Sequence, residues 1–204
     1  MKMLKKKGGM TLVEVLIALA IFVSVIVAVG AFEANTFIYS SSVSGAYQTA
    51  QNAQIILKTI LSEIREMQPS ANGSYPLVTT GSTSISFYSD ADNSGSAEQI
   101  TYTLSGTTLY RAVIKPTGTP ASYLSANQST STLMTNVTNG TSIPVFEYFD
   151  TNYNGTSSPL AQPVTATNVR LIKANLRLDL DPNRSPLPII YTVQASLRNL
   201  KSNL

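Results

Sequence analysis

The hydrophobic positions near the start of the chain form one unbroken run. Residues 15–32 are 18 consecutive positions without a charged side chain, and most of them are Val, Ile, Leu, Ala or Phe. A helix rises about 1.5 Å per residue, so about 18–20 apolar residues cross the hydrocarbon core of a bilayer. The pattern therefore predicts one membrane-spanning helix near the N-terminus.

A single carboxylate, Glu14, stands at the entrance of this run. A carboxylate in the middle of a bilayer costs roughly 2–3 kcal/mol or more, and the cost falls toward the membrane surface. Four basic residues precede it, namely Lys2, Lys5, Lys6 and Lys7. Because cytoplasmic flanks carry an excess of lysine and arginine, we expect the N-terminus inside the cell. Glu14 then lies near the inner surface, at the positive end of the helix dipole.

The helical pattern continues beyond the membrane run and is ended by Pro69. Residues 33–53 give only a weak pattern, in which Phe37, Tyr47 and Ala50 are compatible with a packed stripe. From residue 54 the apolar positions recur at helical spacing, on one face: Leu57, Ile60, Leu61, Ile64 and Met67. The charged residues of this stretch are predicted to point away from that face: Lys58, Glu63, Arg65 and Glu66.

From Pro76 the apolar period changes to two, which is typical of strands with one buried face. The alternating segments lie at residues 85–87, 100–104, 109–113, 145–149, 169–180 and 189–197. We expect six or seven short strands in one antiparallel sheet. Residues 116–142 are rich in Ser, Thr, Asn and Gly and predict a long surface excursion, with one short element near Leu133 and Met134.

Composition excludes several classes of function. The chain has no Cys, His or Trp, which rules out disulfides, triads built on His, and zinc sites with Cys or His ligands. The net charge of +3 comes from the four N-terminal lysines, because without them 10 basic side chains face 11 acidic ones. The basic pI is therefore no argument for nucleic-acid binding. No nucleophile–base pair or phosphate loop is visible, so enzyme activity is not expected.

The N-terminal residues resemble a known signal. The string KKKGG-MTLVEVLIA at residues 5–18 is similar to the class III signal of type IV prepilins and type II secretion pseudopilins. This resemblance implies that a prepilin peptidase cuts after Gly9 and methylates the amine of Met10, where the family usually has Phe. It also implies that Glu14, the fifth mature residue, pairs with the N-terminal amine of a neighbouring subunit.

Two other interpretations of the N-terminus compete with this one. An ordinary secretory signal peptide would be cleaved near Ala28-Val29-Gly30, but the apolar run is long for such a signal and Glu14 interrupts its start. A plain signal anchor would leave Glu14 without a role. The glycine pair, the glutamate spacing, the basic leader and the apolar length together favour the prepilin-type signal.

The rest of the chain fits the architecture that the resemblance implies. We expect an α+β fold, in which a long N-terminal helix, membrane-spanning and then amphipathic, packs on an antiparallel β-sheet domain. The expected parts are a leader at 1–9, a transmembrane and assembly helix at 10–32, its amphipathic continuation at 33–68, and a globular domain at 69–204. Short clusters are similar to those of the larger minor pseudopilins, the J class, and its pilus counterparts: FY at 87–88, QITY at 99–102, LYR at 109–111 and LRNL at 197–200.

Two loops carry clustered oxygen ligands. The first reads DADNSG and offers Asp90, Asp92, Ser94 and Glu98, like the front half of a calcium-binding loop. The twelfth position is Thr101 and not Glu, which excludes an EF-hand, so the prediction is an irregular calcium site. The second loop, DTNYNG at 150–155, has one charge. Turn formation by Asx and Gly residues is the alternative for both loops.

These observations predict a structural subunit, a minor pilin or pseudopilin. It would span the cytoplasmic membrane once, with the C-terminal domain outside, and later join a filament at the cell surface. The expected partners are other pilins or pseudopilins, prepilin peptidase and the cytoplasmic membrane. A major pilin is one alternative. Another is a membrane-anchored binding module, an adhesin or DNA-uptake receptor, with its binding residues in the 116–142 excursion.

Overall fold

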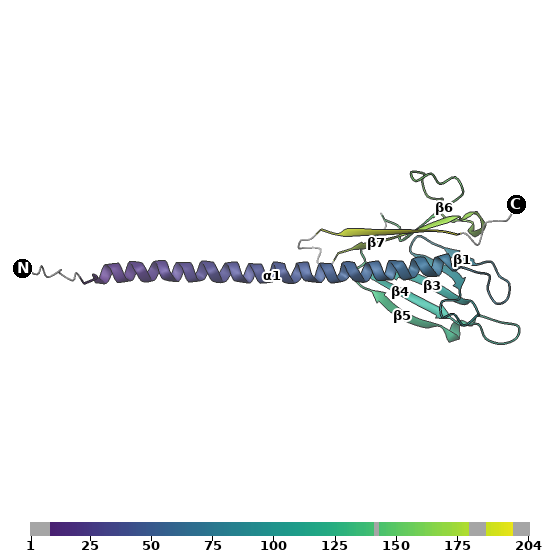
Figure 1. Cartoon of the computed structure of the whole chain (residues 1–204), viewed down its shortest axis with the longest axis horizontal. Helices are drawn as coiled ribbons and strands as arrows, with labels where there is room; N and C mark the ends of the chain where they lie inside the picture. The colour runs from purple at the N-terminus through teal and green to yellow at the C-terminus, as the bar shows by residue number, and fades with distance from the viewer. Residues whose placement is uncertain (1–8, 141–142, 180–186, 198–204) are drawn as a thin grey trace, which may run out of the picture. The chain divides into compact units, whose positions relative to one another are not determined.

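The computed structural model describes residues 9–140, 143–179 and 187–197. The chain divides into two compact units, with the boundary between Gly45 and Ala46. Helix α1 (Leu12–Arg65) begins in the first unit and ends in the second, and all described strands belong to the second unit (Figure 1). Every strand pairing is antiparallel. The predicted α+β class, with a long N-terminal helix and antiparallel strands, is confirmed.

In the first unit, α1 leaves its apolar side chains exposed. Among the described helices, α1 has the length and apolar composition needed to cross a membrane, and its most apolar 18-residue window has no residue buried within the chain. Leu16, Phe22 and Val27 are each more than half exposed. So large an exposed apolar surface indicates contact with a bilayer or with other proteins. The predicted apolar span is therefore present as one unbroken helix.

In the second unit, the last turns of α1 bury the predicted stripe. Leu57, Ile60, Ile64 and Met67 are almost fully buried, and Ala53 extends the stripe toward the N-terminus. Leu61 is only half-buried at its margin. Helix α1 ends at Arg65, before Pro69, as the sequence predicts.

One prediction about this helix is wrong. Glu63 does not point away from the packed face, because its side chain is buried and bonded to two residues of the sheet. A charged residue is expected at the surface unless a partner satisfies it. Here Tyr102 and Arg111 supply that partner, so the charge is retained within the packed interface.

A five-stranded sheet forms the larger β layer of the second unit. Its strands are β1 (Leu77–Thr80), β2 (Ser84–Ser89), β3 (Glu98–Ser105), β4 (Thr108–Ile114) and β5 (Ser129–Met134), arranged in that order. Each strand pairs with the next along the chain, so the sheet is a meander. The β3–β4 turn contains Gly106, whose φ of 58° favours glycine.

A separate three-stranded sheet contains β6 (Phe146–Phe149), β7 (Leu171–Leu178) and β8 (Ile189–Ser196). The prediction of one sheet with six or seven strands is therefore wrong, since eight strands lie in two sheets within the described residues. Alternation shows which side of a strand is buried but not which strand lies beside it. Between β5 and β6, Val137 forms only an isolated bridge with Leu178 of β7. The chain thus passes from one sheet to the other.

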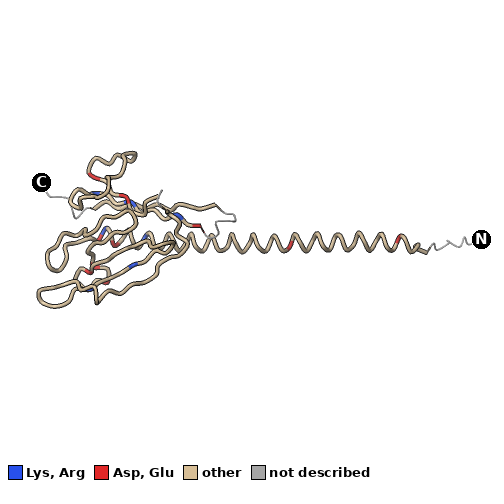
Figure 2. The backbone as a smooth tube through the Cα atoms, turned by 180° about the vertical axis from the view of Figure 1, so that it is seen from behind, with Lys and Arg blue, Asp and Glu red and all other residues tan. Residues whose placement is uncertain are grey.

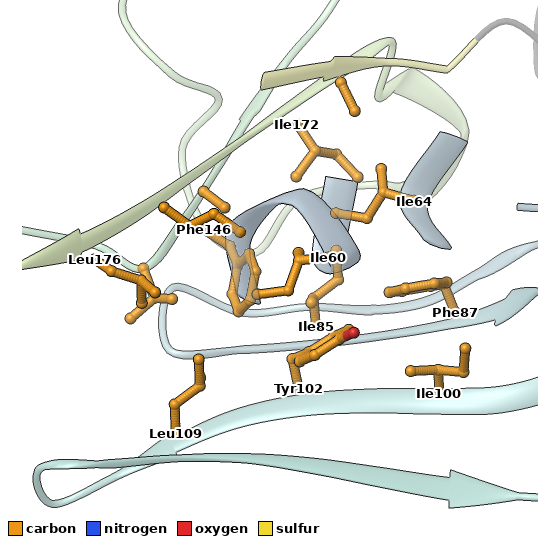
Figure 3. Close-up of a cluster of buried hydrophobic side chains, with 14 of the residues drawn as sticks. Ile60, Ile64, Ile85, Phe87, Ile100, Tyr102, Leu109, Phe146, Ile172 and Leu176 are labelled. Carbon is orange, nitrogen blue, oxygen red and sulfur yellow. The ribbon is translucent and has the colours of Figure 1, made fainter. Parts of the chain in front are cut away.

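The core of the second unit is built from α1 and both sheets. Figure 3 shows buried side chains contributed by α1, by β2, β3 and β4 of the larger sheet, and by β6 and β7 of the smaller one: Ile60, Ile64, Ile85, Phe87, Ile100, Tyr102, Leu109, Phe146, Ile172 and Leu176. Each of these is at most 2% exposed. Removing large apolar side chains from water is the main favourable term in such a core.

The predicted excursion at residues 116–142 is only partly a loop. Strand β5 occupies its second half, where a short element near Leu133 was expected, and residues 141–142 lie outside the described part. In its first half, Tyr123 packs on Tyr88 with ring centroids 4.8 Å apart. The Tyr123 hydroxyl also accepts a hydrogen bond from the Ala71 amide and donates one to the Ala97 carbonyl. Tyr123 therefore holds the first half of the excursion against β2 and against the residues that precede β1 and β3.

Two predicted features extend beyond the described residues. The segment expected at 169–180 forms β7 from Leu171 to Leu178, and residues 180–186, which include Asp181, are not described. Residues 198–200 of the C-terminal LRNL cluster are also outside the described part.

Candidate functional site

The residues of the predicted cleavage lie directly before α1. Gly9 and Met10 are exposed and non-helical, and α1 begins at Leu12. A peptide bond held in a helix is a poor protease substrate because its backbone groups are already paired. The Gly9–Met10 bond is free of that constraint. The lysines of the leader and Gly8 lie outside the described residues.

Glu14 and Thr11 cap the start of α1. The Thr11 amide and hydroxyl donate to Glu14 Oε2 at 2.8 and 3.0 Å, and the Glu14 amide donates to the Thr11 hydroxyl at 3.3 Å. This reciprocal pattern is a capping box, which satisfies amides that lack partners in the first turn. Its signal is the string T-L-V-E before an apolar run, and the sequence-based interpretation of Glu14 did not use it.

The cap leaves one carboxylate oxygen of Glu14 available. Both bonds from Thr11 reach Oε2, and no hydrogen bond to Oε1 occurs among the described residues. Glu14 and Glu33 are the charged side chains of residues 9–45, and Figure 2 shows how sparse the coloured, charged positions are along the N-terminal part of the helix. Of these two, Glu14 precedes the apolar run. A cation of an adjacent molecule at the level of Glu14 would therefore meet a carboxylate that the capping box holds in place.

The first oxygen-rich loop brings the three predicted carboxylates together. Ligand oxygens of Asp90, Asp92 and Glu98 lie within 4.8 Å of one another. Backbone amides already bond these carboxylates: Ser94 and Gly95 donate to Asp90, Ser94 also donates to Asp92, and Ala91 donates to Glu98. The fourth predicted ligand, Ser94, therefore contributes its amide to the loop. Both the turn interpretation and a small cation site are compatible with this arrangement.

A lysine that the sequence-based prediction missed lies on the same cluster. Lys115 Nζ is 2.5 Å from Asp92 Oδ2, and it follows β4. Its ammonium group lowers the pKa of Asp92 below the usual range. Burial raises the pKa of Glu98, and the neighbouring Asp92 carboxyl raises it further. Nothing in the local string DADNSG indicates Lys115, because it lies 23 positions from Asp92.

The cluster also borders a pocket of about 510 Å³ with mixed charges. Its lining comprises Ala91, Asp92, Glu98, Arg111, Val113, Lys115, Asn127 and Ser129. Both of its cations already have acidic partners, because Lys115 pairs with Asp92 and Arg111 pairs with Glu63. The pocket therefore presents no unpaired cation for an anionic ligand.

The second oxygen-rich loop is held by turn contacts. The Asn152 amide donates to Asp150 Oδ1, and Asn154 Oδ1 accepts bonds from Thr156 and Ser157. Gly155 has a φ of 96°, which favours glycine. These are Asx turns of the ordinary kind, and Asp150 is the only carboxylate of this loop.

The calcium site stays a prediction, and Lys115 gives it a sharper test. Calcium must displace the ammonium group from Asp92, so Lys115→Met should bind calcium more tightly than the wild type. At about ten times the Kd, binding contributes roughly 1.4 kcal/mol, or about 3–5 °C in Tm. Thermal unfolding of the full chain with and without millimolar calcium measures this. The double variant Asp90→Ala/Asp92→Ala is the control, and an unchanged Tm in all three proteins contradicts the prediction.

A buried polar cluster joins α1 to the larger sheet. Arg111 Nη2 lies 2.7 Å from Glu63 Oε1, and the Tyr102 hydroxyl donates to Glu63 Oε2 at 2.5 Å. Burial and the Glu63 charge both raise the pKa of Tyr102, so its hydroxyl keeps its proton. Residue spacing in the sequence does not predict this cluster, because Tyr102 and Arg111 lie 39 and 48 positions from Glu63. The cluster thus links α1 directly to β3 and β4.

Comparison with known families gives one match. Residues 4–30 match the model of the prokaryotic N-terminal methylation motif, which includes Gly9, Met10 and Glu14 and most of the apolar run. A search of curated proteins returned no match. The match thus covers the segment in which the predicted cleavage and the capping box lie.

Proposed function

We propose that this chain, whose N-terminal methylation motif and α+β fold are those of type IV pilins and pseudopilins, is a structural subunit of a filament. The observation that carries the proposal is the combination of the matched motif with a helix that leaves its apolar surface uncovered. Such a helix is stable in two environments, a bilayer and a bundle of similar helices. The protein uses the first before assembly and the second after it.

Processing prepares the subunit for assembly. Prepilin peptidase removes residues 1–9 and thereby removes four lysines from the cytoplasmic flank. The new N-terminus is the methylated amine of Met10, which remains cationic, next to the capped start of α1. In the bundle, this amine pairs with Glu14 of an adjacent subunit. A buried charge needs such a partner because removing it from water is costly.

The orientation follows from the charge distribution. The lysines of the leader hold the N-terminus in the cytoplasm, so α1 crosses the inner membrane once and the second unit lies outside. We further propose a minor role, as in the J class and its pilus counterparts. The short FY, QITY and LYR clusters support this role, and they lie in β2, β3 and β4.

Mass spectrometry of the mature protein tests the processing. The expected N-terminal residue is N-methylated Met10, because cleavage falls after Gly9 and methylation follows. An intact leader, or an N-terminus near Ala31 as left by an ordinary signal peptidase, contradicts the proposal.

Peptide quantities from the same filament preparations test the minor role. A copy number equal to that of the principal subunit contradicts it.

A further inference from the structure

A groove lies between α1 and β5 in the second unit. It has a volume of about 470 Å³, and its lining comprises Thr49, Asn52, Ile55 and Ile56 from α1 and residues 132–136 from the other side. Ile55 is 63% exposed, and Leu133 and Ile56 are half-buried. Strand β5 is at the edge of its sheet. The groove thus combines apolar side chains with threonine and asparagine side chains.

A bulge in β5 places Leu133 at this groove. Leu109 pairs with Met134 and Tyr110 pairs with Thr132, so Leu133 is an extra residue on the β5 side. Such bulges change the direction of a side chain at a sheet edge. Leu133 and Met134 both belong to the lining of the groove.

Both walls of the groove come from uncharged parts of the chain. Residues 34–57 and 116–146 contain no Asp, Glu, Lys or Arg. Edge strands commonly carry charges that prevent another chain from docking, and β5 carries none. An occupant of this groove would desolvate no charge, as in the cores of protein interfaces, where charged residues are depleted.

A helical segment with matching chemistry occurs in the chain itself. Phe37, Tyr39, Val43 and Tyr47 are each more than 60% exposed, and they follow the predicted membrane span. Between them lie small residues, namely Ser40, Ser41, Ser42, Ser44, Gly45 and Ala46. Aromatic residues are enriched at interfaces, and small residues let a helix approach its partner closely. Such a surface is expected to be covered in an assembly.

We propose that the α1–β5 groove receives the post-membrane helix of a second copy of this chain. The occupant is an uncharged helix that presents aromatic residues separated by small ones, as residues 37–47 of this chain do. This inference rests on the assembly role proposed above and adds a second contact outside the membrane. In this arrangement, the pair between Glu14 and the neighbouring amine joins two helices at the membrane entrance. The groove joins the second unit of one subunit to the helix of its neighbour outside the membrane.

Disulfide cross-linking between copies of the full chain tests the groove. The chain has no cysteine, so each introduced thiol is the only one in its copy. Val43→Cys in one tagged copy and Thr132→Cys in another should form a disulfide-linked dimer when both are overproduced in membranes and oxidised. The matched control is Thr79→Cys, an exposed threonine of β1 at the opposite edge of the same sheet. We expect about tenfold less dimer with this control, since proximity sets the effective concentration.

A second pair of variants tests the lining of the groove. Ile55→Lys places a charge in the groove at an exposed position, so it should reduce the Val43–Thr132 dimer several-fold without unfolding the domain. Thr59→Lys, also exposed on α1 but outside the lining, should leave the dimer yield unchanged. Equal yields in the two lysine variants contradict the proposal.

A separate cross-link distinguishes failure of the groove from failure of the assembly role. Leu19→Cys in both copies reports helix packing within the membrane run. Cross-linking at Leu19 with no more Val43–Thr132 dimer than Val43–Thr79 dimer overturns the groove contact and leaves the assembly role intact. Absence of the Leu19 dimer as well overturns helix packing between copies of this chain, and the groove contact between copies with it.

Discussion

Glu14→Gln is expected to be cleaved after Gly9 as in the wild type but to enter filaments at least roughly 30-fold less. Glutamine can replace glutamate in a capping box, so the bonds with Thr11 and the start of α1 remain. The charge is lost, and the amine of the neighbouring Met10 then has no buried partner. Truncating one member of a buried charge pair costs about 2–5 kcal/mol, and every 1.4 kcal/mol is about tenfold. The measurement is the share of processed protein in purified filaments.

Two further variants separate the charge of Glu14 from its cap. Thr11→Ala removes the capping hydroxyl but keeps the carboxylate, and loss of such a cap costs about 1 kcal/mol. It should therefore assemble much better than Glu14→Gln. Glu14→Ala removes both functions and should assemble no better than Glu14→Gln. If Glu14→Gln assembles normally while Thr11→Ala fails, Glu14 serves the helix start and the salt bridge to a neighbour is wrong.

Features that depend on neighbours in the sequence could be predicted. The membrane run, the stripe from Leu57 to Met67 and the strands around Phe87 and Tyr102 all follow from the apolar period, because each period belongs to one element. The same holds for the Asp90 loop, where Asx and Gly positions produce a turn. The capping box is likewise local, because the string from Thr11 to Glu14 has the spacing that such a cap requires.

Features that depend on distant partners could not be predicted. The sequence alone predicts Glu63 at the surface because a lone carboxylate avoids burial, and only Tyr102 and Arg111 make its burial favourable. The contact between Lys115 and Asp92 also joins residues 23 positions apart, so no local pattern predicts it. The division into two sheets depends on which strands meet, and side-chain alternation within β5 or β6 has no information on that choice. Long-range polar contacts and strand partners are therefore where the structure adds most.

Arg111→Met is expected to destabilise the second unit by about 3–5 kcal/mol. The side chain of Glu63 is 9% exposed and that of Arg111 is 22% exposed, so removing the arginine leaves a charge in a site that water reaches poorly. Breaking a buried pair from one side has a cost of about this size. Glu63→Leu should cost less, because the guanidinium group that remains is more exposed. Urea unfolding of the full chain in detergent, followed by tyrosine fluorescence, measures both changes.

The triple variant Glu63→Leu/Tyr102→Phe/Arg111→Met gives the decisive comparison. It removes every polar member of the cluster, so no buried group remains without a partner, and it should be more stable than Arg111→Met alone. Arg65→Met is the matched control, since Arg65 is exposed on α1 and forms no ion pair among the described residues. Its effect should lie within about 0.5 kcal/mol of zero. If Arg111→Met behaves like Arg65→Met, the Glu63 carboxylate is solvated in the folded protein and does not hold α1 on the sheet.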